Sequence, residues 1–340
     1  MEIRKLNTLR GLAALIVVVS HFSNATGWLN GSLGRGAGQL GVMLFFVLSG
    51  FLMAYLYMSQ TSNQRTIKKY AIARFARVVP LYLLIVLLSY ALHRAGIHNV
   101  LYKMPSSEML IAHLLTIKGI SVLWTIGPEL QFYVVFLALW WLAAKREGLV
   151  YVIMAASLVG LFFLDFPRYK GVIVGLPYDI ALLQSLPYFF TGVVFGRLYA
   201  TQSLAIPVYL RSGWFIATLL LIPLMYPVIF SSITGARHGM WSELAVLLII
   251  ALIFFSILFL VPDNNKLMNN AAGDFFGKIS YSLYLLHLPV LWQVHRLEIS
   301  HHGLMLVVFI TCAIAVSYFS YRFIERPCAN YIRSFEHGRS

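Results

Sequence analysis

The stretch from Arg10 to His21 reads Arg-Gly-Leu-Ala-Ala-Leu-Ile-Val-Val-Val-Ser-His, an apolar run with a cation at its start and an imidazole at its end. At about 100° per residue, eleven residues make close to three helical turns. The pattern therefore predicts Arg10 and His21 on one helix face, roughly 16 Å apart along the axis. An ionisable residue inside a membrane-type helix is costly, which favours a functional site. The alternative is a helix-end histidine at the level of the lipid headgroups.

The composition is that of a membrane protein. The 340 residues are 60% hydrophobic and 11% charged, whereas soluble domains carry about 25% charged residues. Long apolar runs recur from end to end, which predicts a polytopic protein. The first run is not followed by a small-residue cleavage site, so it is interpreted as a retained helix. Without an internal repeat or a long linker, residues 1–340 are expected to form a single integral-membrane domain.

The predicted fold is all-α, a polytopic transmembrane helical bundle. Several of the apolar runs are short for a hydrocarbon core of about 30 Å, so some helices are expected to be tilted or broken. About ten spans are predicted, at residues 8–23, 38–58, 76–93, 124–144, 149–164, 179–200, 213–230, 240–261, 280–295 and 303–324.

The basic residues predict the orientation of the chain. With the N-terminus inside, the inner segments hold 18 of the 26 lysines and arginines and the outer segments hold 8. By the positive-inside rule, both termini are expected in the cytoplasm and His21 in the outer half of the first span. The basic excess thus indicates membrane orientation and an anionic ligand, with no nucleic-acid partner. Cys312 and Cys328 show no metal or redox spacing, and no metal site is predicted.

Two arginines precede the third span in the run Arg74-Phe-Ala-Arg77-Val-Val-Pro80. Positions i and i+3 share a helix face. Two interpretations remain open: a pair of positive-inside anchors, or a clamp for phosphate, because guanidinium groups match phosphate oxygens in a bidentate way.

The fourth span begins with Trp124, Pro128, Glu129 and Tyr133. Pro128 suits the first helical position, and Glu129 then falls in the first turn, where the helix dipole favours a carboxylate. Because this helix enters from the outer side, Glu129 is expected at a depth similar to that of His21. A carboxylate there could fix the tautomer of the histidine and support it as a base.

Two further spans carry polar or small residues among apolar ones. Ser49 and Gly50 in the second span predict a close approach of helices. Ser280, Tyr284 and His287 in the ninth span lie at i, i+4 and i+7, which is one helix face. That polar stripe is expected to face the bundle interior, either for hydrogen bonds between helices or as part of a site.

Taken together, these residues resemble acyltransferase family 3, the integral-membrane acyltransferases that modify bacterial surface carbohydrates. The resemblance runs from about residue 4 to 330. It is closer to the compact exopolysaccharide or O-antigen O-acetyltransferases than to the longer forms with a fused periplasmic hydrolase-like domain. The matching pieces are Arg10-Gly11 with His21, Phe45 to Phe51, Arg74 and Arg77 with Pro80, Trp124 with Glu129 and Tyr133, Ser280 to Tyr284 with His287 and Pro289, and Glu325-Arg326-Pro327.

The resemblance implies transfer of an acyl group, usually acetyl from acetyl-CoA, to a sugar hydroxyl. The protein would lie in the bacterial cytoplasmic membrane, use acyl-CoA as a co-substrate and hold no tightly bound cofactor. Its acceptor would be a polysaccharide or a lipid-linked oligosaccharide, and a homo-oligomer remains open. His21 would act as general base or, alternatively, form an acyl-imidazole. The other roles would be Glu129 orienting His21, Arg10, Arg74 and Arg77 holding the CoA phosphates, and Trp124, Tyr133, Tyr284 and His287 contacting substrate.

Two other classes of protein would also explain intramembrane charges. A transporter or flippase for an anionic glycan needs histidine, glutamate and arginine within the membrane, but such proteins often show inverted repeats and paired broken helices. A structural subunit of an export complex would not require Arg10 and His21 to share a face. Binding of acetyl-CoA by the purified protein discriminates the enzyme from both.

Overall fold

The structure is a computed structural model that describes residues 3–163, 170–173, 176–179, 181–204 and 206–337. Two of the basic residues used to orient the chain, Arg168 and Arg339, lie outside the described residues, as does the predicted span edge at residue 164.

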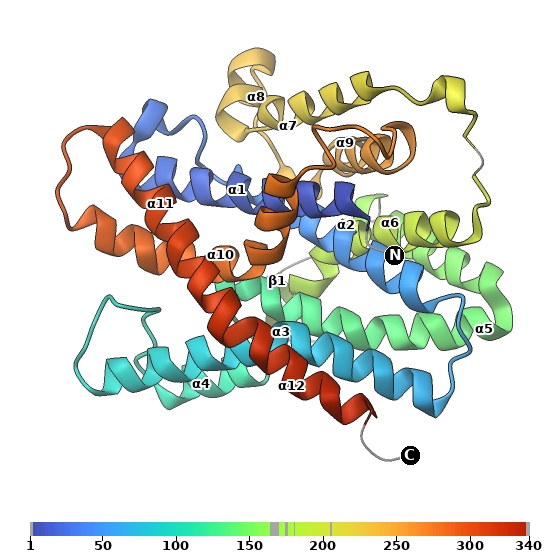
Figure 1. Ribbon diagram of the computed structural model, residues 1–340, viewed down its shortest axis with the longest axis horizontal. Coiled ribbons are helices and arrows are strands. Elements are labelled where there is room, and N and C mark those ends of the chain that lie inside the picture. The colour runs from blue at the N-terminus through green and yellow to red at the C-terminus, as the bar shows by residue number, and fades with distance from the viewer. Residues whose placement is uncertain (1–2, 164–169, 174–175, 180, 205, 338–340) are drawn as a thin grey trace. The chain divides into compact units, whose positions relative to one another are not determined.

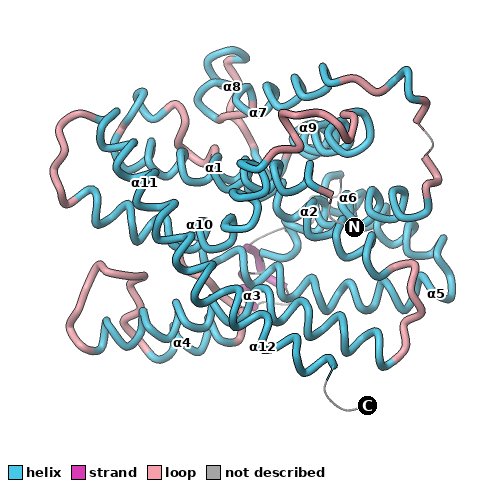
Figure 2. The backbone as a smooth tube through the Cα atoms, viewed as in Figure 1, coloured by secondary structure: helices cyan, strands magenta, loops and turns pink. Residues whose placement is uncertain are grey.

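Helices make up most of the described chain (Figure 2), which confirms the prediction of a helical fold. One small exception was not predicted. The strands β1 (Lys170–Ile173) and β2 (Leu176–Asp179) pair as an antiparallel hairpin, with Lys170 opposite Asp179.

The chain divides into two compact units, described here separately. The first unit comprises residues 1–59, 151–166 and 184–280. Its elements are α1 (Arg4–Thr26), η1 (Trp28–Gly31), α2 (Gly38–Tyr57), the end of α5 (Ile126–Phe163), most of α6 (Ala181–Thr201), η3 (Val208–Leu210), η4 (Gly213–Leu220), α7 (Leu221–Leu224), α8 (Pro227–Thr234), η5 (Met240–Ser242), α9 (Leu244–Phe255), η6 (Ser256–Leu260) and the start of α10 (Ala271–His295).

Glycines bring the helices of the first unit into close contact. Helices α1 and α2 lie side by side (Figure 1). A Cβ atom at Gly50 of α2 would overlap the carbonyl oxygen of Phe189 in α6, and one at Gly192 of α6 would overlap that of Val47 in α2. The predicted close approach at Ser49 and Gly50 is therefore confirmed. Backbones this close gain dispersion contacts that larger residues would prevent.

The second unit comprises residues 60–150, 167–183 and 281–340. Its helix α12 lies alongside α3 (Figure 1). Its elements are α3 (Gln64–Arg94), α4 (Ser107–Leu114), η2 (Ser121–Thr125), most of α5, the hairpin, the start of α6, the end of α10, α11 (His302–Ser320), η7 (Tyr321–Glu325) and α12 (Arg326–His337).

Tyrosine hydroxyl groups join the elements of the second unit. Buried tyrosines donate to backbone carbonyl oxygens that lie far away in sequence. Each bond satisfies a polar group that burial would otherwise leave unpaired. The pairs are Tyr70 with Tyr133, Tyr82 with His113, Tyr102 with Leu285, Tyr281 with Val78 and Tyr284 with Val122.

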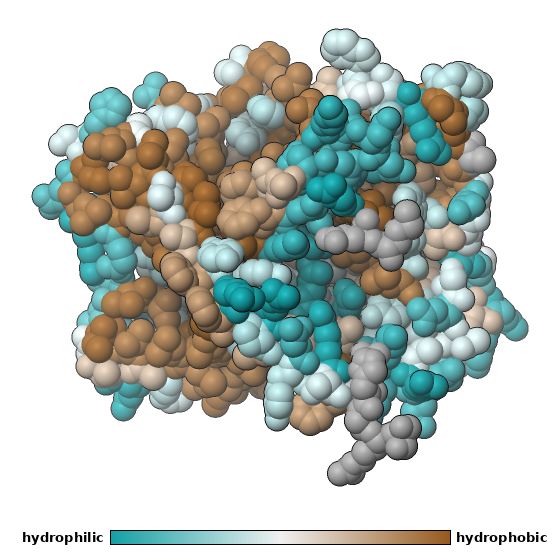
Figure 3. Space-filling model, viewed as in Figure 1, coloured by the Kyte–Doolittle hydropathy of each residue, from teal (hydrophilic) through white to brown (hydrophobic). Residues whose placement is uncertain are grey.

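Several helices are long and apolar enough to cross a membrane. Among the described residues, five helical segments meet that description, and the count rises to six if one bent pair is a single span. Figure 3 shows apolar side chains along α11, where Val307 and Phe319 are 61% and 59% exposed. Such a face suits lipid rather than water. The chain is a membrane protein, whereas the count of ten spans and the side of each terminus stay predictions.

Three predicted spans have different boundaries in the structure. The predicted spans 124–144 and 149–164 are two parts of α5, separated by non-helical torsions at Arg146 (φ −148°, ψ 75°). The predicted span 213–230 is broken, because α8 meets the preceding helical segment at 85°. Pro227 begins α8 and, lacking an N–H, cannot continue the preceding helix.

Candidate active site

Helix α1 carries both Arg10 and His21. Arg10 and His21 lie within one uninterrupted helix, Arg4–Thr26, and both side chains are half-buried. A rise of 1.5 Å per residue separates them by roughly 16 Å, as predicted. The helix ends at Gly27, whose φ of 71° is the left-handed conformation that favours glycine at this position.

The first turns of α1 are anchored by buried polar contacts. Lys5 is 3% exposed, and its Nζ atom donates to the carbonyl oxygens of Leu258 at 3.0 Å and Val261 at 2.8 Å. It also pairs with Asp263 at 2.8 Å. The guanidinium of Arg4 pairs with Asp274 at 2.6 Å. These contacts fix the axial position of α1, and so the level at which Arg10 and His21 lie.

Backbone contacts hold α1 further along its length. A Cβ atom at Gly41 of α2 would overlap the carbonyl oxygen of Ala13. The backbone N–H of Gly38 donates to the hydroxyl of Ser20 at 2.8 Å. Because Ser20 directly precedes His21, the second helix fixes the turn from which the imidazole projects.

The imidazole of His21 hydrogen-bonds the carbonyl oxygen of Val17, one turn earlier in the same helix. A carbonyl oxygen only accepts, so the ring donates an N–H there. In a neutral imidazole the other ring nitrogen then carries the lone pair, which is the form that general-base catalysis needs. The helix itself thus selects a tautomer for His21.

In the second unit, three predicted site residues surround a fourth, Tyr133. The hydroxyl of Tyr133 donates to the Oε1 atom of Glu129 at 2.7 Å, one turn earlier in α5. The charges of Arg74 and Arg77 in α3 also act on this hydroxyl. The backbone of Tyr133 is tied to α3, because its carbonyl oxygen accepts from the Tyr70 hydroxyl at 2.9 Å. A carboxylate, a phenol and two guanidinium groups thereby share one neighbourhood.

The arginines lie deeper in their helix than the sequence predicted. Helix α3 begins at Gln64, where Asn63 and Thr66 form a capping box, so Arg74 and Arg77 are about three turns inside it. Arg74 is only 8% exposed and Arg77 is half-buried. A lipid anchor keeps its head group at the interface, so this burial favours the interpretation of the pair as part of a site.

The polar stripe of α10 is buried, as predicted. Tyr284 is 6% exposed, and its hydroxyl donates to the carbonyl oxygen of Val122 in η2, the short helix that also carries Trp124. His287 is fully buried. Its Nδ1 atom lies 3.1 Å from the carbonyl oxygen of Leu283, and its ring lies 6.2 Å from that of Tyr284.

Sequence reasoning missed two buried groups beside these residues. Ser282 donates to Glu325 at 2.8 Å, and its Oγ atom lies 3.1 Å from the Ser320 hydroxyl, which gives the carboxylate of the π-helical segment η7 a partner on α10. Tyr281 lies close enough to Glu129 and Glu325 for their charges to act on its hydroxyl. The sequence motif Ser280 to Tyr284 contained both residues, but only the face of Ser280, Tyr284 and His287 was considered.

The nine predicted site residues fall into two groups. Arg10 and His21 belong to the first unit. The structure brings together three residues of the second unit around Tyr133, and joins Tyr284 to the segment that carries Trp124. Within the described residues, no group of three or more histidine, cysteine, aspartate or glutamate side chains is placed to hold a metal ion.

Similar sequences are found among known proteins. A family described as "Acyltransferase domain", of the acyltransferase 3 type, matches residues 3–322. The chain is 25% identical over 359 aligned positions to proteins from Staphylococcus aureus strains COL and MSSA476, each named "Putative O-acetyltransferase". The alignment covers 95% of this chain and 56% of each relative, so the chain spans about half the length of those proteins. No solved structure matches.

Proposed function

The chain belongs to acyltransferase family 3, and on that premise we propose that it transfers an acetyl group from acetyl-CoA to a hydroxyl of a surface carbohydrate. The observation that carries the proposal is the state of His21. It is half-buried on a helix anchored at several points, and its hydrogen bond to Val17 leaves the lone pair on the other ring nitrogen. An imidazole in that form can accept a proton from an acceptor hydroxyl.

The proposed binding sites of CoA and the carbohydrate follow from the charges of the side chains. CoA is anionic and cytoplasmic, so Arg74 and Arg77 of α3, with Arg10 of α1, would hold its phosphates through bidentate guanidinium contacts. In this proposal both termini are cytoplasmic and the carbohydrate approaches from the outer side of the cytoplasmic membrane. A reporter fused after Ser340 that is active only in the periplasm would contradict this orientation.

The proposed chemistry is a single displacement at the thioester. The ring nitrogen of His21 that does not donate to Val17 takes the proton of the acceptor hydroxyl while that oxygen attacks the thioester carbonyl. A carbon–oxygen bond forms, the carbon–sulfur bond breaks, and the imidazolium returns its proton to the departing CoA thiolate. Glu129 would orient the imidazole and stabilise its charged form. Trp124, Tyr133, Tyr284 and His287 would contact the substrates.

The variant that tests the donor site is the double substitution Arg74→Ala with Arg77→Ala. Removing two charge-assisted contacts should weaken binding of acetyl-CoA by about 100-fold or more, on the basis of about 1.5–3 kcal/mol for each charged hydrogen bond. The single variant Arg77→Lys should bind acetyl-CoA more tightly than the double alanine variant but less tightly than the unaltered protein, because an ammonium cannot form the bidentate fork. The measurement is equilibrium binding of acetyl-CoA to the purified protein.

The matched control is Arg237→Ala, which removes an exposed arginine from the segment after α8. Its affinity for acetyl-CoA should equal that of the unaltered protein. Unchanged affinity in the folded double variant would make the arginines membrane anchors. If the unaltered protein does not bind acetyl-CoA at all, the proposed reaction is wrong and a glycan transporter becomes the better explanation.

A further inference from the structure

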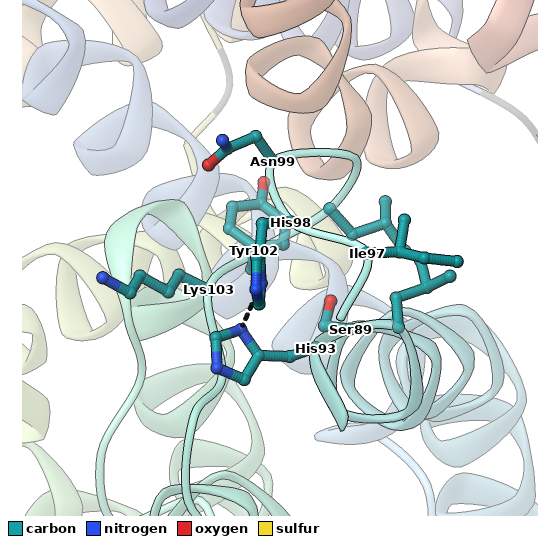
Figure 4. A pocket seen from close by; sticks show the side chains of 9 residues that line it. Ser89, His93, Ile97, His98, Asn99, Tyr102 and Lys103 are labelled. Carbon is teal, nitrogen blue, oxygen red and sulfur yellow. Dashed lines mark hydrogen bonds between the residues drawn. The ribbon is translucent and has the colours of Figure 1, made fainter. Parts of the chain in front are cut away.

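A cavity of about 500 Å³ lies at the C-terminal end of α3, within the second unit (Figure 4). That volume falls within the range of small-molecule sites, about 300–1,000 Å³. On the predicted orientation this end of α3 is outside the cytoplasm. The cavity is lined by Ser89, Leu92, His93, Ile97, His98, Asn99, Leu101, Tyr102 and Lys103.

The wall of the cavity is held in place by α10. The hydroxyl of Tyr102 donates to the carbonyl oxygen of Leu285 at 2.7 Å, and Gln293 donates to the carbonyl oxygen of Asn99 at 2.6 Å. The ring of Tyr102 packs edge-on against Trp292, with centroids 5.6 Å apart. Tyr102 is 2% exposed. The loop after α3 is therefore a fixed wall, and it reaches α10 beside Tyr284.

A buried hydroxyl in this cavity has no hydrogen-bond partner within the described part of the chain. Ser89 is 2% exposed, and its Oγ atom bonds to no described residue. Leaving a buried hydroxyl unpaired costs free energy, so such groups in native proteins usually have a partner. The Oγ atom is enclosed, so a rotation of the Ser89 side chain toward the cavity would bring it to a hydroxyl-bearing ligand, which would supply that partner.

Two imidazoles add both kinds of hydrogen-bonding group. The Nδ1 atoms of His93 and His98 lie 3.2 Å apart, joined by the dashed line in Figure 4. When both rings are neutral, the ring that donates from Nδ1 has an accepting Nε2, and its partner has a donating Nε2. The pair therefore presents one donor and one acceptor, the combination that pairs with sugar hydroxyls.

The charge of the cavity is positive. Figure 4 shows the two imidazoles between Lys103 on one side and Ser89 and Ile97 on the other. Lys103 and Arg94 both lie close enough to His93 to act on it electrostatically. No aspartate or glutamate is found among the described residues that line the cavity. An anionic group on the ligand would offset these cations.

We propose that this cavity binds an acidic carbohydrate, a sugar unit that carries a carboxylate, and that it is a subsite for the acceptor glycan. The inference rests on the proposed function, because it names the acceptor class of that reaction. The carboxylate lies by Lys103, the sugar hydroxyls pair with Ser89 and the imidazoles, and the ring packs on the apolar side chains. Tyr102 lines the cavity and donates to Leu285, the residue next to Tyr284. This hydrogen bond connects the subsite to Tyr284, one of the predicted substrate contacts.

The test is binding of two disaccharides that differ in one group, measured calorimetrically on the full chain in detergent without acyl donor. Cellobiouronic acid carries a carboxylate where cellobiose carries a hydroxymethyl group. The acid should bind at least about tenfold more tightly than cellobiose, as expected for one charge-assisted contact. Equal affinity, or no binding of the acid, would overturn the inference.

Three variants separate a binding role from a structural one. Lys103→Gln should remove most of the preference for the acid, while Lys118→Gln, the same change at an exposed site in the same predicted outer loop, should leave it intact. Ser89→Ala should weaken both disaccharides about fivefold without lowering thermal stability, because it deletes an unpaired hydroxyl. A preference that survives Lys103→Gln, or affinities that survive Ser89→Ala, would overturn the assignment.

Inorganic phosphate serves as the third probe. If phosphate displaces the acid fully and cellobiose never binds, the cavity holds a simple anion such as a lipid phosphate, and the carbohydrate inference is wrong. The outcome is independent of the donor reaction. Binding of acetyl-CoA without binding of cellobiouronic acid overturns only this inference, and the reverse result overturns only the proposed acyl transfer.

Discussion

Each of the two units of this membrane protein is held together internally, and the kind of contact that does so differs between them. In the first unit, helices approach through glycines whose missing Cβ atoms let backbones touch, as at Gly41, Gly50 and Gly192. In the second unit, large buried tyrosines reach distant carbonyl oxygens, as Tyr70 and Tyr281 do. The stability of the first unit therefore depends on close packing of helix backbones, whereas that of the second unit depends on hydrogen bonds. The predictions below test that contrast.

The largest effect is expected where the close packing is filled. Gly192→Ala places a Cβ atom against the backbone of Val47 and Phe51, which cannot move without shifting α2. Overpacking of this kind should lower the free energy of unfolding by about 3 kcal/mol. Denaturant unfolding in detergent measures it. The matched control is Gly160→Ala, because a Cβ atom there meets nothing within 4 Å. If both variants lose the same stability, the close packing is not what holds α2 and α6 together.

A smaller effect is expected for the tyrosine hydroxyls. Tyr281→Phe and Tyr70→Phe each delete a buried donor, to Val78 at 2.6 Å and to Tyr133 at 2.9 Å. Each should lower the free energy of unfolding by about 1 kcal/mol. Tyr209→Phe, at a side chain that is 84% exposed, should cost nothing measurable. Equal values for the buried and exposed variants would show that these bonds contribute no net stability.

The smallest effect concerns the acid sensitivity of the segment from α4 to η2 in the second unit. His113 donates from Nδ1 to Met109, and its Nε2 accepts the N–H of Ile120 at 3.0 Å. Burial lowers the pKa of His113 below its ordinary value of about 6.5. Below that pH the unfolded chain binds a proton that the folded chain does not, so His113 reduces stability as the pH falls.

The measurement for His113 is thermal unfolding between pH 7 and pH 5. The unaltered protein should lose more stability over that interval than His113→Gln, because the variant has no imidazole to protonate. Both should behave alike above pH 7, apart from a constant offset. A variant that loses as much stability on acidification as the unaltered protein would assign the acid sensitivity to other groups.

Local patterns along the chain predicted a good part of this structure. The placement of Arg10 and His21 on one helix, the close approach at Gly50 and the burial of Tyr284 and His287 all follow from residue type and helical period. Such features depend on one helix at a time. They are confirmed because an intramembrane helix has few alternative conformations.

Other features could not be predicted because they depend on neighbours far away in sequence. The start of α3 was missed because its capping box, at Asn63 and Thr66, lies outside the apolar window that defined the span. No sequence signal pairs Tyr102 with Leu285 or Ser282 with Glu325, since register between helices is set by packing. The cavity at the end of α3 was missed for the same reason.

The central claim is that His21 is the base of an acyl transfer, and His287 provides the sharpest comparison. Both imidazoles hydrogen-bond the carbonyl oxygen four residues earlier, but His21 is half-buried whereas His287 is fully buried. The measurement is the rate of acetyl transfer from acetyl-CoA to the natural glycan by solubilised His21→Ala, His21→Gln and His287→Ala proteins. Thermal stability and acetyl-CoA binding are measured in parallel.

Both His21 variants should stay folded, bind acetyl-CoA and lose about 10²–10⁴ in rate, the usual cost of a missing general base. His287→Ala should lose less rate, and mainly through lower stability, because its ring fills a buried position. A folded His21→Ala protein that transfers acetyl at near the unaltered rate would contradict the account. So would a folded His287→Ala protein that has lost transfer entirely, because His287 would then be the base.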